Sequence, residues 1–382
     1  MTGERNIPFV VPYFDEGEAN AAANAVRSCR VSATGQYGKQ AEQELQNMFG
    51  CRFALLVTSC THALELALMA LDIGPGDEVI VPSFTFVSSA NAILQQGAKP
   101  VFAEIREDTL NIDPEDVRRK ITDRTKALVP VHYAGVACDM DALLTLAREH
   151  DLSVVEDAAQ AVDSKYNDKY LGTIGTVGCY SFHDTKNVSC GEGGALLTQD
   201  ERLWRQAEIM REKGTNRSAF FRGEVDKYTW VDRGSSYVLS DILATILCQQ
   251  LRKVDDIRQK RQAIYSQYVD GLAALSEKGD IILPIIPDEC CPNYHIFWFR
   301  TRSADERARC LSTLKKEGIG ATFHYVPLHS SPFAHERWGI KKDELPVTER
   351  VGETLIRLPL HPHMTREDAD HVVKAVRNLF GR

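Results

Sequence analysis

One lysine lies in a setting that suits covalent chemistry. Lys186 follows a short apolar run, residues 177–182, and precedes a glycine-rich turn and a second apolar run, residues 195–197. The pattern predicts a lysine held between two strands. Burial disfavours the ammonium form, so a lysine that ends a strand in a partly dry site can lose its proton, and the neutral amine can form a Schiff base. Because most lysines are exposed surface residues, this interpretation depends on the neighbouring motifs.

An acidic residue ends a second apolar run. Residues 154–160 read Val-Val-Glu-Asp-Ala-Ala-Gln, so we expect Asp157 at the carboxyl end of a strand, where α/β sheets bind their ligands. If a helical turn begins there, Gln160 shares its face three residues later. A plain helix cap, which contributes about 1 kcal/mol, is the commoner use of such a residue when it is considered alone.

Two further segments suit a phosphorylated aromatic ligand. In residues 57–64 a strand passes through small hydroxyl residues, with Cys60 and Thr61 at the junction, into an amphipathic helix. The free amides and the helix dipole at such a junction favour a phosphate, although a simple cap is the commoner use of these residues. Residues 82–88 contain Phe84 and Phe86, either of which can cover a flat ring or fill the core.

Together these motifs describe a pyridoxal phosphate site, with an amine, an acid for the ring nitrogen, a phosphate cup and a stacking aromatic. Asp157 would keep the pyridine nitrogen protonated, and Lys186 would carry a proton between substrate and cofactor carbons. Residues 172–178 superficially look like a dinucleotide loop, but their spacing is not G-x-G-x-x-G and they precede a strand. The Walker A, H-E-x-x-H and G-x-S-x-G signatures do not occur in the sequence.

Alternating strand-like and helical runs from residue 53 to residue 155 position these motifs. This alternation predicts a mostly parallel sheet with helices on both faces. A long helical pattern over 240–275 marks the expected domain joint, which gives a large domain of residues 1–250 with an extended N-terminal arm and a smaller α+β domain of residues 251–382. In the smaller domain we expect strands near 281–283, 294–300 and 322–325 and helices near 304–316, 348–357 and 366–379.

Composition limits the function classes. The net charge of −8 argues against nucleic acid as a partner. The ten cysteines lack the Cys-x-x-Cys spacing of zinc or redox sites, so no metal is expected. No apolar run approaches the length needed to span a bilayer, and residues 1–5 are polar, so we expect a cytoplasmic protein with reduced thiols that does not bind membranes.

Three motifs carry a family resemblance: Asp157-x-x-Gln160, Ser181-Phe182-x-x-x-Lys186 and the glycine-rich segment 191–194. They resemble the motif set of the sugar aminotransferase branch of fold type I pyridoxal phosphate enzymes. Further segments match in family order over nearly the whole chain, at 59–64, 76–80, 130–132, 326–329 and 358–360. The resemblance implies an α/β fold with a mostly parallel mixed sheet flanked by helices and a smaller C-terminal domain.

The resemblance also implies individual roles. Lys186 would be the Schiff-base lysine, Asp157 would pair with the ring nitrogen, Gln160 would pair with the ring hydroxyl and Phe86 would stack on the ring. The phosphate would be held by Cys60, Thr61 and Ser181. Family members are homodimers with active sites at the interface, and Ser236 stands where the family usually supplies an asparagine to the partner's cofactor phosphate.

The resemblance is closer to one subgroup of the family in four segments, 212–218, 221–223, 225–230 and 234–237. They are similar to a subgroup that aminates dTDP-4-keto-6-deoxyglucose with L-glutamate to give dTDP-4-amino-4,6-dideoxygalactose, for surface glycans such as enterobacterial common antigen and for lipopolysaccharide. This implies Arg217 and Lys227 as diphosphate ligands and places Tyr325 and His329 near the sugar. A solvated or structural role stays open for these four residues.

Alternative functions remain at this stage. The gluco epimer of the product, another nucleotide keto sugar, or a cofactor-binding regulator without turnover are compatible with the same motifs. Sugar dehydratases of the same fold carry histidine in place of the lysine, so Lys186 favours transamination.

Overall fold

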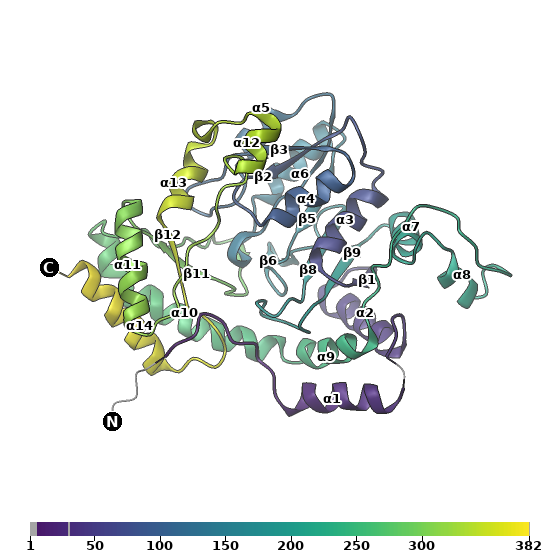
Figure 1. Ribbon diagram of the computed structural model, residues 1–382, viewed down its shortest axis with the longest axis horizontal. Coiled ribbons are helices and arrows are strands. Elements are labelled where there is room, and N and C mark those ends of the chain that lie inside the picture. The colour runs from purple at the N-terminus through teal and green to yellow at the C-terminus, as the bar shows by residue number, and fades with distance from the viewer. Residues whose placement is uncertain (1–5, 30, 382) are drawn as a thin grey trace.

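The computed structural model describes residues 6–29 and 31–381; residues 1–5, 30 and 382, and with them the start of the first predicted domain, lie outside the described residues. A seven-stranded sheet forms its centre, in the order β1-β9-β8-β5-β4-β2-β3 (Figure 1). Only β9 runs antiparallel to its neighbours, so the predicted mostly parallel sheet is confirmed. The strands are β1 Phe53–Val57, β2 Glu78–Pro82, β3 Lys99–Ala103, β4 Thr125–Leu128, β5 Ser153–Asp157, β8 Val177–Ser181 and β9 Gly194–Thr198.

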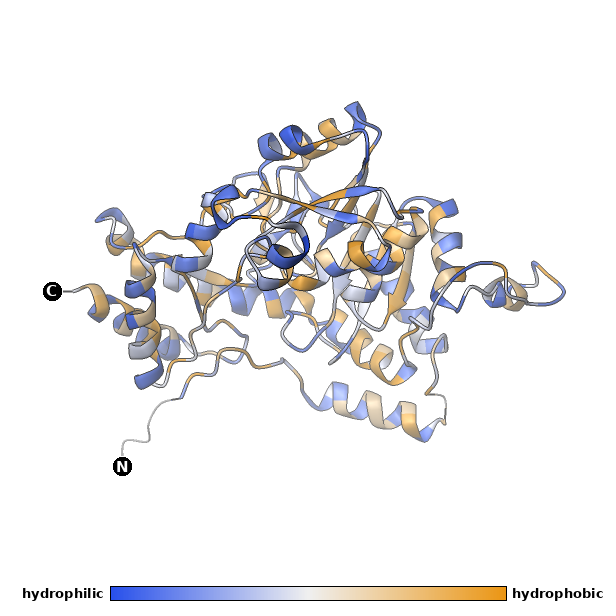
Figure 2. Ribbon diagram, turned by 45° about the horizontal axis from the view of Figure 1, so that its top comes forward, coloured by the Kyte–Doolittle hydropathy of each residue, from blue (hydrophilic) through white to orange (hydrophobic). Residues whose placement is uncertain are grey.

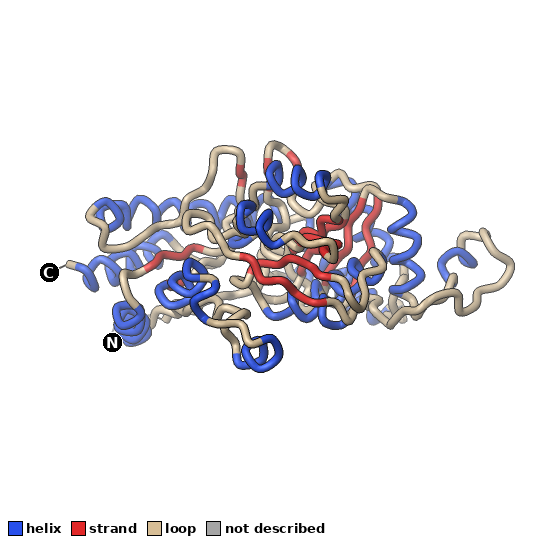
Figure 3. Tube along the Cα trace, turned by 90° about the horizontal axis from the view of Figure 1, so that it is seen from above, coloured by secondary structure: helices blue, strands red, loops and turns tan. Residues whose placement is uncertain are grey.

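Helices cover both faces of this sheet, as predicted from the alternation (Figure 3). Side chains of a strand point alternately to its two faces, and β1 shows the result: Ala54 and Leu56 join one apolar core, whereas Leu55 and Val57 join the other. Figure 2 shows hydrophobic residues along the central strands. One core includes α2 Gln36–Phe49, α5 Pro114–Lys120, α6 Met140–Glu149 and α9 Asp241–Leu251; the other includes α3 Cys60–Ala70, α4 Val87–Gln95 and α7 Glu201–Arg211.

A third core lies in the C-terminal part, around the antiparallel pair β11 Phe297–Arg300 and β12 Leu355–Leu358. Ile7 of the N-terminal arm joins this core and pairs with Ile319. The domain boundary after residue 250 remains a prediction; it falls near the end of α9, and all other members of the third core follow it in the sequence. The helices here are α10 Val254–Glu277, α11 Ala304–Lys316, α12 Pro332–Trp338, α13 Pro346–Thr354 and α14 Arg366–Phe380.

The remaining elements lie outside the seven-stranded sheet and its covering helices. They are α1 Glu16–Arg27, α8 Arg217–Phe221, the 3-10 helices Tyr133–Gly135 and Lys342–Glu344, and a small sheet of β6 Lys165–Tyr166, β7 Lys169–Tyr170 and β10 Cys290–Cys291. The segment that carries α8 projects from the body of the molecule (Figures 1 and 3). Within the described residues, no helix combines the length and apolarity that crossing a membrane requires.

Three sequence predictions were wrong in the C-terminal part. The expected strands at 281–283 and 322–325 are single bridges, Ile282 to Arg300 and Thr322 to Arg357. The helix expected over 348–357 ends at Thr354, because residues 355–358 pair with β11 instead. Tertiary pairing overrides local helical periodicity here. The long pattern at 240–275 is two helices, α9 and α10.

Glu156 organises the loop before β8. Its fully buried carboxylate accepts backbone N–H bonds from Gly172 (2.8 Å), Ile174 (2.7 Å) and Gly175 (2.6 Å), and lies 2.9 Å from His132 Nε2. The glycine-rich segment that was rejected as a dinucleotide loop therefore wraps a carboxylate of its own chain. The neighbouring β5 residue is Asp157, so this loop also fixes the edge of the sheet where the site lies.

We predict that Glu156→Gln lowers the free energy of unfolding by about 3 kcal/mol, because an amide cannot accept from every donor that faces it and places an N–H against backbone N–H groups. Denaturant titration of the purified variant measures this change. Glu149→Gln, at an exposed position of α6, is the matched control and should change stability by no more than about 0.5 kcal/mol. An equal effect of the two substitutions would contradict the anchoring role.

Candidate active site

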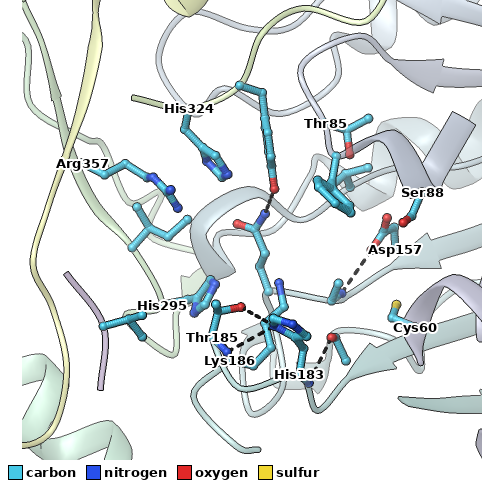
Figure 4. A pocket seen from close by; sticks show the side chains of 18 of the residues that line it. Cys60, Thr85, Ser88, Asp157, His183, Thr185, Lys186, His295, His324 and Arg357 are labelled. Atoms are coloured by element: carbon cyan, nitrogen blue, oxygen red, sulfur yellow. Dashed lines mark hydrogen bonds between the residues drawn. The ribbon is translucent and has the colours of Figure 1, made fainter. Parts of the chain in front are cut away.

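A cavity of about 570 Å³ lies at the carboxyl ends of β5 and β8 and at the start of α3. Loops of the C-terminal part and the N-terminal arm complete its wall. Figure 4 shows Lys186 between two sides, with Asp157, Ser88 and Cys60 on one and Arg357 and His324 on the other. The predicted residues that line it are Cys60, Thr61, Phe86, Asp157, Gln160, Ser181, Lys186 and Tyr325.

Lys186 sits in a tight turn after β8, where its backbone N–H donates to the carbonyl of His183 at 2.9 Å. Part of the side chain faces the cavity, yet the surrounding protein desolvates the amine and lowers its pKa. Asp157 opposes this decrease and Arg357 adds to it. The amine is therefore more easily deprotonated than that of a surface lysine, which suits a nucleophile.

Asp157 is a buried carboxylate held from two directions. Ser89 Oγ donates to Oδ2 at 2.7 Å, and the backbone N–H of Ala159 donates to Oδ1 at 3.2 Å. Because the Ser89 proton is used in this way, Thr85, 2.9 Å from Ser89, must donate to it. Burial raises the pKa of Asp157, while these hydrogen bonds and the charge of Lys186 oppose that rise. Turns follow Asp157, so it does not cap a helix.

The start of α3 offers free backbone donors to the cavity. Ser59 is the N-cap, and its hydroxyl accepts the N–H of His62 at 3.2 Å. The first N–H groups of a helix, here those of Cys60 and Thr61, have no intrahelical acceptor. A Cβ on Gly194 would lie 2.6 Å from the Cys60 nitrogen, so this glycine lets β9 approach the junction closely. The Thr61 and Ser88 hydroxyls lie 2.7 Å apart beside it.

Gln160 and Tyr325 bring the two parts of the chain together. Gln160 Oε1 accepts the N–H of Ala134 at 2.7 Å, and Nε2 donates to the Tyr325 hydroxyl at 3.0 Å. Phe86 is 57% exposed and lines the cavity, whereas Phe84 is the core phenylalanine. Of the two roles considered for the phenylalanines of residues 82–88, Phe86 is therefore suited to covering a ring, and Phe84 fills the core.

Sequence reasoning missed the wall from the C-terminal part. His295 and His324 line the cavity, and burial lowers the pKa of both imidazoles well below the ordinary value. Arg261 and Arg357 also line it. No motif marked these residues, because they meet the site only through long-range packing. Arg357 even fell inside a segment expected to be helical.

Four predicted residues lie outside the lining of this cavity. Arg217 pairs with Glu212 at 3.3 Å, and Lys227 and Ser236 are exposed. The placement of His329 near the sugar needs correction: it is fully buried, and its Nδ1 lies 2.7 Å from Ser83 Oγ. The backbone N–H of Leu328 donates to the Ser83 carbonyl at 3.0 Å, and this hydrogen bond holds the neighbouring His329 against Ser83.

Comparison with known proteins identifies the family. Residues 12–377 match the model of the DegT/DnrJ/EryC1/StrS aminotransferase family. The chain belongs to this family. It is 36% identical over 388 residues to the spore coat polysaccharide biosynthesis protein SpsC of Bacillus subtilis, with 99% of each chain covered.

Solved structures agree with this membership. The chain superposes on DesV of S. venezuelae, in complex with a ketimine intermediate, with a TM-score of 0.90 and 35% identity, over 99% of each chain. The putative sugar aminotransferase Spr1654 of Streptococcus pneumoniae gives a TM-score of 0.91 at 28% identity over 98% of each chain, and its structures include PLP and PMP forms. The chain is thus a sugar aminotransferase that uses pyridoxal 5′-phosphate (PLP), as the motifs predicted.

The residues of the cavity fit this cofactor. Lys186 offers an amine of lowered pKa, Asp157 a buried carboxylate suited to a protonated ring nitrogen, and the start of α3 unpaired backbone donors for a phosphate. All three features line one cavity, with Asp157 and Cys60 on the same side of Lys186. Among the described residues, no three metal-ligating side chains cluster.

We predict that Asp157→Asn lowers the pKa of Lys186 in cofactor-free protein, because the Asp157 charge stabilises the ammonium form. The midpoint pH for labelling of Lys186 by an amine-reactive reagent, followed by peptide mass spectrometry, should therefore shift downward. Asp123→Asn, at an exposed position, should leave the midpoint unchanged. An upward shift in Asp157→Asn would contradict the electrostatic coupling.

Proposed function

We propose that the chain moves the amino group of L-glutamate to the 4-keto carbon of dTDP-4-keto-6-deoxyglucose and forms dTDP-4-amino-4,6-dideoxygalactose. The convergence of Lys186, Asp157 and the start of α3 in one cavity carries the aminotransferase part of this proposal. The likeness of segments 212–237 to the subgroup with this substrate supports the choice of sugar. A role of the product in surface polysaccharide synthesis agrees with the name of SpsC, a spore coat polysaccharide biosynthesis protein.

In this proposal the cavity residues divide the tasks of cofactor binding and proton transfer. When bound, PLP supplies the electron sink for the carbanion. Asp157, held by Ser89 and Ala159, keeps a proton on the ring nitrogen. Lys186 holds the cofactor covalently between turnovers and moves a proton at the amine-bearing carbon of each substrate. Gln160 faces the ring hydroxyl, and Phe86 covers the ring.

The remaining cofactor contacts follow from the start of α3. The hydroxyls of Thr61 and Ser181 and the first amides of the helix hold the phosphate, with Cys60 at the helix start. Tyr325, which accepts a hydrogen bond from Gln160 at the cavity wall, contacts the sugar in this proposal. His295 and His324 are uncharged at neutral pH because burial lowers their pKa values, so they give the cavity wall polar groups without positive charge.

We further propose a homodimer with shared sites. Arg217 begins α8 in the projecting segment, Lys227 follows α8, and Ser236 pairs with Glu212. None of the three lines the cavity of its own chain, so their proposed ligand contacts require a second copy. The same segment exposes Phe221 and Trp230, the latter 77% exposed, which suits burial against a partner. We place the enzyme in the cytoplasm, in line with its ten free cysteines.

The reaction is tested with nitrogen-labelled glutamate and dTDP-4-keto-6-deoxyglucose. We expect the label in the product, with proton spectra that show an axial amine. Lys186→Ala should reduce turnover by at least about a thousandfold while circular dichroism stays unchanged. An equatorial amine would show that the product is the gluco epimer. If no keto sugar tested acquires the label, the transfer itself is refuted.

The dimer is tested by complementation. Lys186→Ala and the double variant Arg217→Ala, Lys227→Ala should each be weakly active alone. When the two are unfolded and refolded together, activity should return, because one mixed site then combines an intact lysine with an intact segment. Self-refolded samples of each variant are the controls. No recovery on mixing, or full activity of a monomer in sedimentation, would contradict the shared site.

A further inference from the structure

Arg357 is partly buried, and its contacts differ from those of the fully buried arginines. Arg211 pairs with Glu42 at 2.6 Å, and Arg300 pairs with Glu107 at 3.0 Å. Arg357 makes no ion pair with any described carboxylate, and its Nε atom is buried without a hydrogen-bond partner. A buried charge without a partner is costly. Arg357 lies at the wall of the cavity, where an anionic ligand can pair with its charge.

The other cation of this wall is already satisfied. Arg261 Nε donates to the carbonyl of Tyr294 at 2.9 Å and its NH2 group donates to the carbonyl of His295 at 2.6 Å. His324 and His295 are neutral because burial lowers their pKa values. An arginine, by contrast, keeps its charge at all ordinary pH values. Arg357 is therefore the permanent, unsatisfied positive charge on the side of the cavity opposite Asp157 (Figure 4).

The backbone and a ring hold the guanidinium in place. Arg357 lies in β12, where alternation sends Ile356 and Leu358 into the third core and turns Arg357 toward the cavity. Its guanidinium carbon lies 4.6 Å from the ring centroid of Phe9 in the N-terminal arm. Stacking of this kind fixes the plane of the fork and leaves its edge free to bind a carboxylate with two parallel hydrogen bonds.

We propose that Arg357 binds a carboxylate of the amino donor and thereby selects an acidic amino acid. This inference rests on the proposed function, in which the donor's amine meets Lys186. The charge of Arg357 acts on Lys186, so the two cations share one electrostatic environment. A donor carries a carboxylate on its reacting carbon, whereas the keto sugar carries its diphosphate across the ring from the reacting carbon. The start of α3, on the far side, is the place for the cofactor phosphate.

The test uses the holoenzyme and glutamate without any sugar. The change in cofactor absorption gives the apparent Kd for L-glutamate. In Arg357→Gln this Kd should rise at least about tenfold, with a smaller rise in Arg357→Lys, because a charged bidentate contact is lost or weakened. Arg118→Gln, a surface arginine of α5, is the matched control and should bind glutamate as the wild type does.

L-Alanine distinguishes the two carboxylates of glutamate. If Arg357 binds the side-chain carboxylate, alanine should react equally with wild type and Arg357→Gln. If the Kd values of alanine and glutamate rise together, Arg357 binds the α-carboxylate that all amino acids share, and its selection of an acidic donor is refuted. An unchanged glutamate Kd, or a loss confined to the KM for the keto sugar, would overturn the proposal.

Calorimetry with glutarate separates this inference from the proposed function. Glutarate has two carboxylates and no amine, so its binding to the holoenzyme requires no chemistry. It should bind wild type and Arg118→Gln and lose at least about tenfold in affinity for Arg357→Gln. A wild type that binds glutarate through Arg357 but transfers no nitrogen to any sugar would refute the acceptor alone. Equal glutarate binding by wild type and Arg357→Gln would refute the role of Arg357.

Discussion

The site depends on the electrostatic balance between an acid and an amine in a place that disfavours charge. Parallel strands end together, so the sheet delivers Asp157 and the turn of Lys186 to one edge, where the surrounding protein desolvates both groups. Burial raises the pKa of the acid and lowers that of the amine, and the attraction between the two opposes both shifts. Thr85 and Ser89 contribute to this balance, because Ser89 donates a hydrogen bond to the Asp157 carboxylate and Thr85 donates one to Ser89.

The sequence predicted those parts of the fold that local pattern determines. The alternating pattern was expected to begin at residue 53, where β1 begins, and α11 was expected at its observed bounds, because continuous apolar runs and capped helical periodicity are local properties. Lys186 and Asp157 were found for a related reason: Asp157 ends an apolar strand, Lys186 lies in the turn that follows another, and strand ends of an α/β sheet meet at one edge. The resemblance to known enzymes added roles for Gln160 and Phe86 that spacing alone did not supply.

What escaped prediction depends on distant partners. Residues 355–358 look like the end of a helix until β11 offers them a strand to pair with. His324 and Arg357 then enter the cavity from a region whose local sequence carries no catalytic motif. His329 shows the opposite error, since its family position suggested a sugar contact and Ser83 holds it in the interior. Which face of a loop looks into a cavity is a property of packing, and no residue type encodes it.

The N-terminal arm has a consequence for how the enzyme matures. Phe9 reaches Arg357, and Ile7 pairs with Ile319, so almost the whole chain must be synthesised before the first segment finds its place. The central sheet has local βα neighbours and can assemble earlier, whereas this closure is among the most non-local contacts of the molecule. Binding competence is therefore acquired late, and a nascent chain with a finished sheet would still have an unfinished cavity wall.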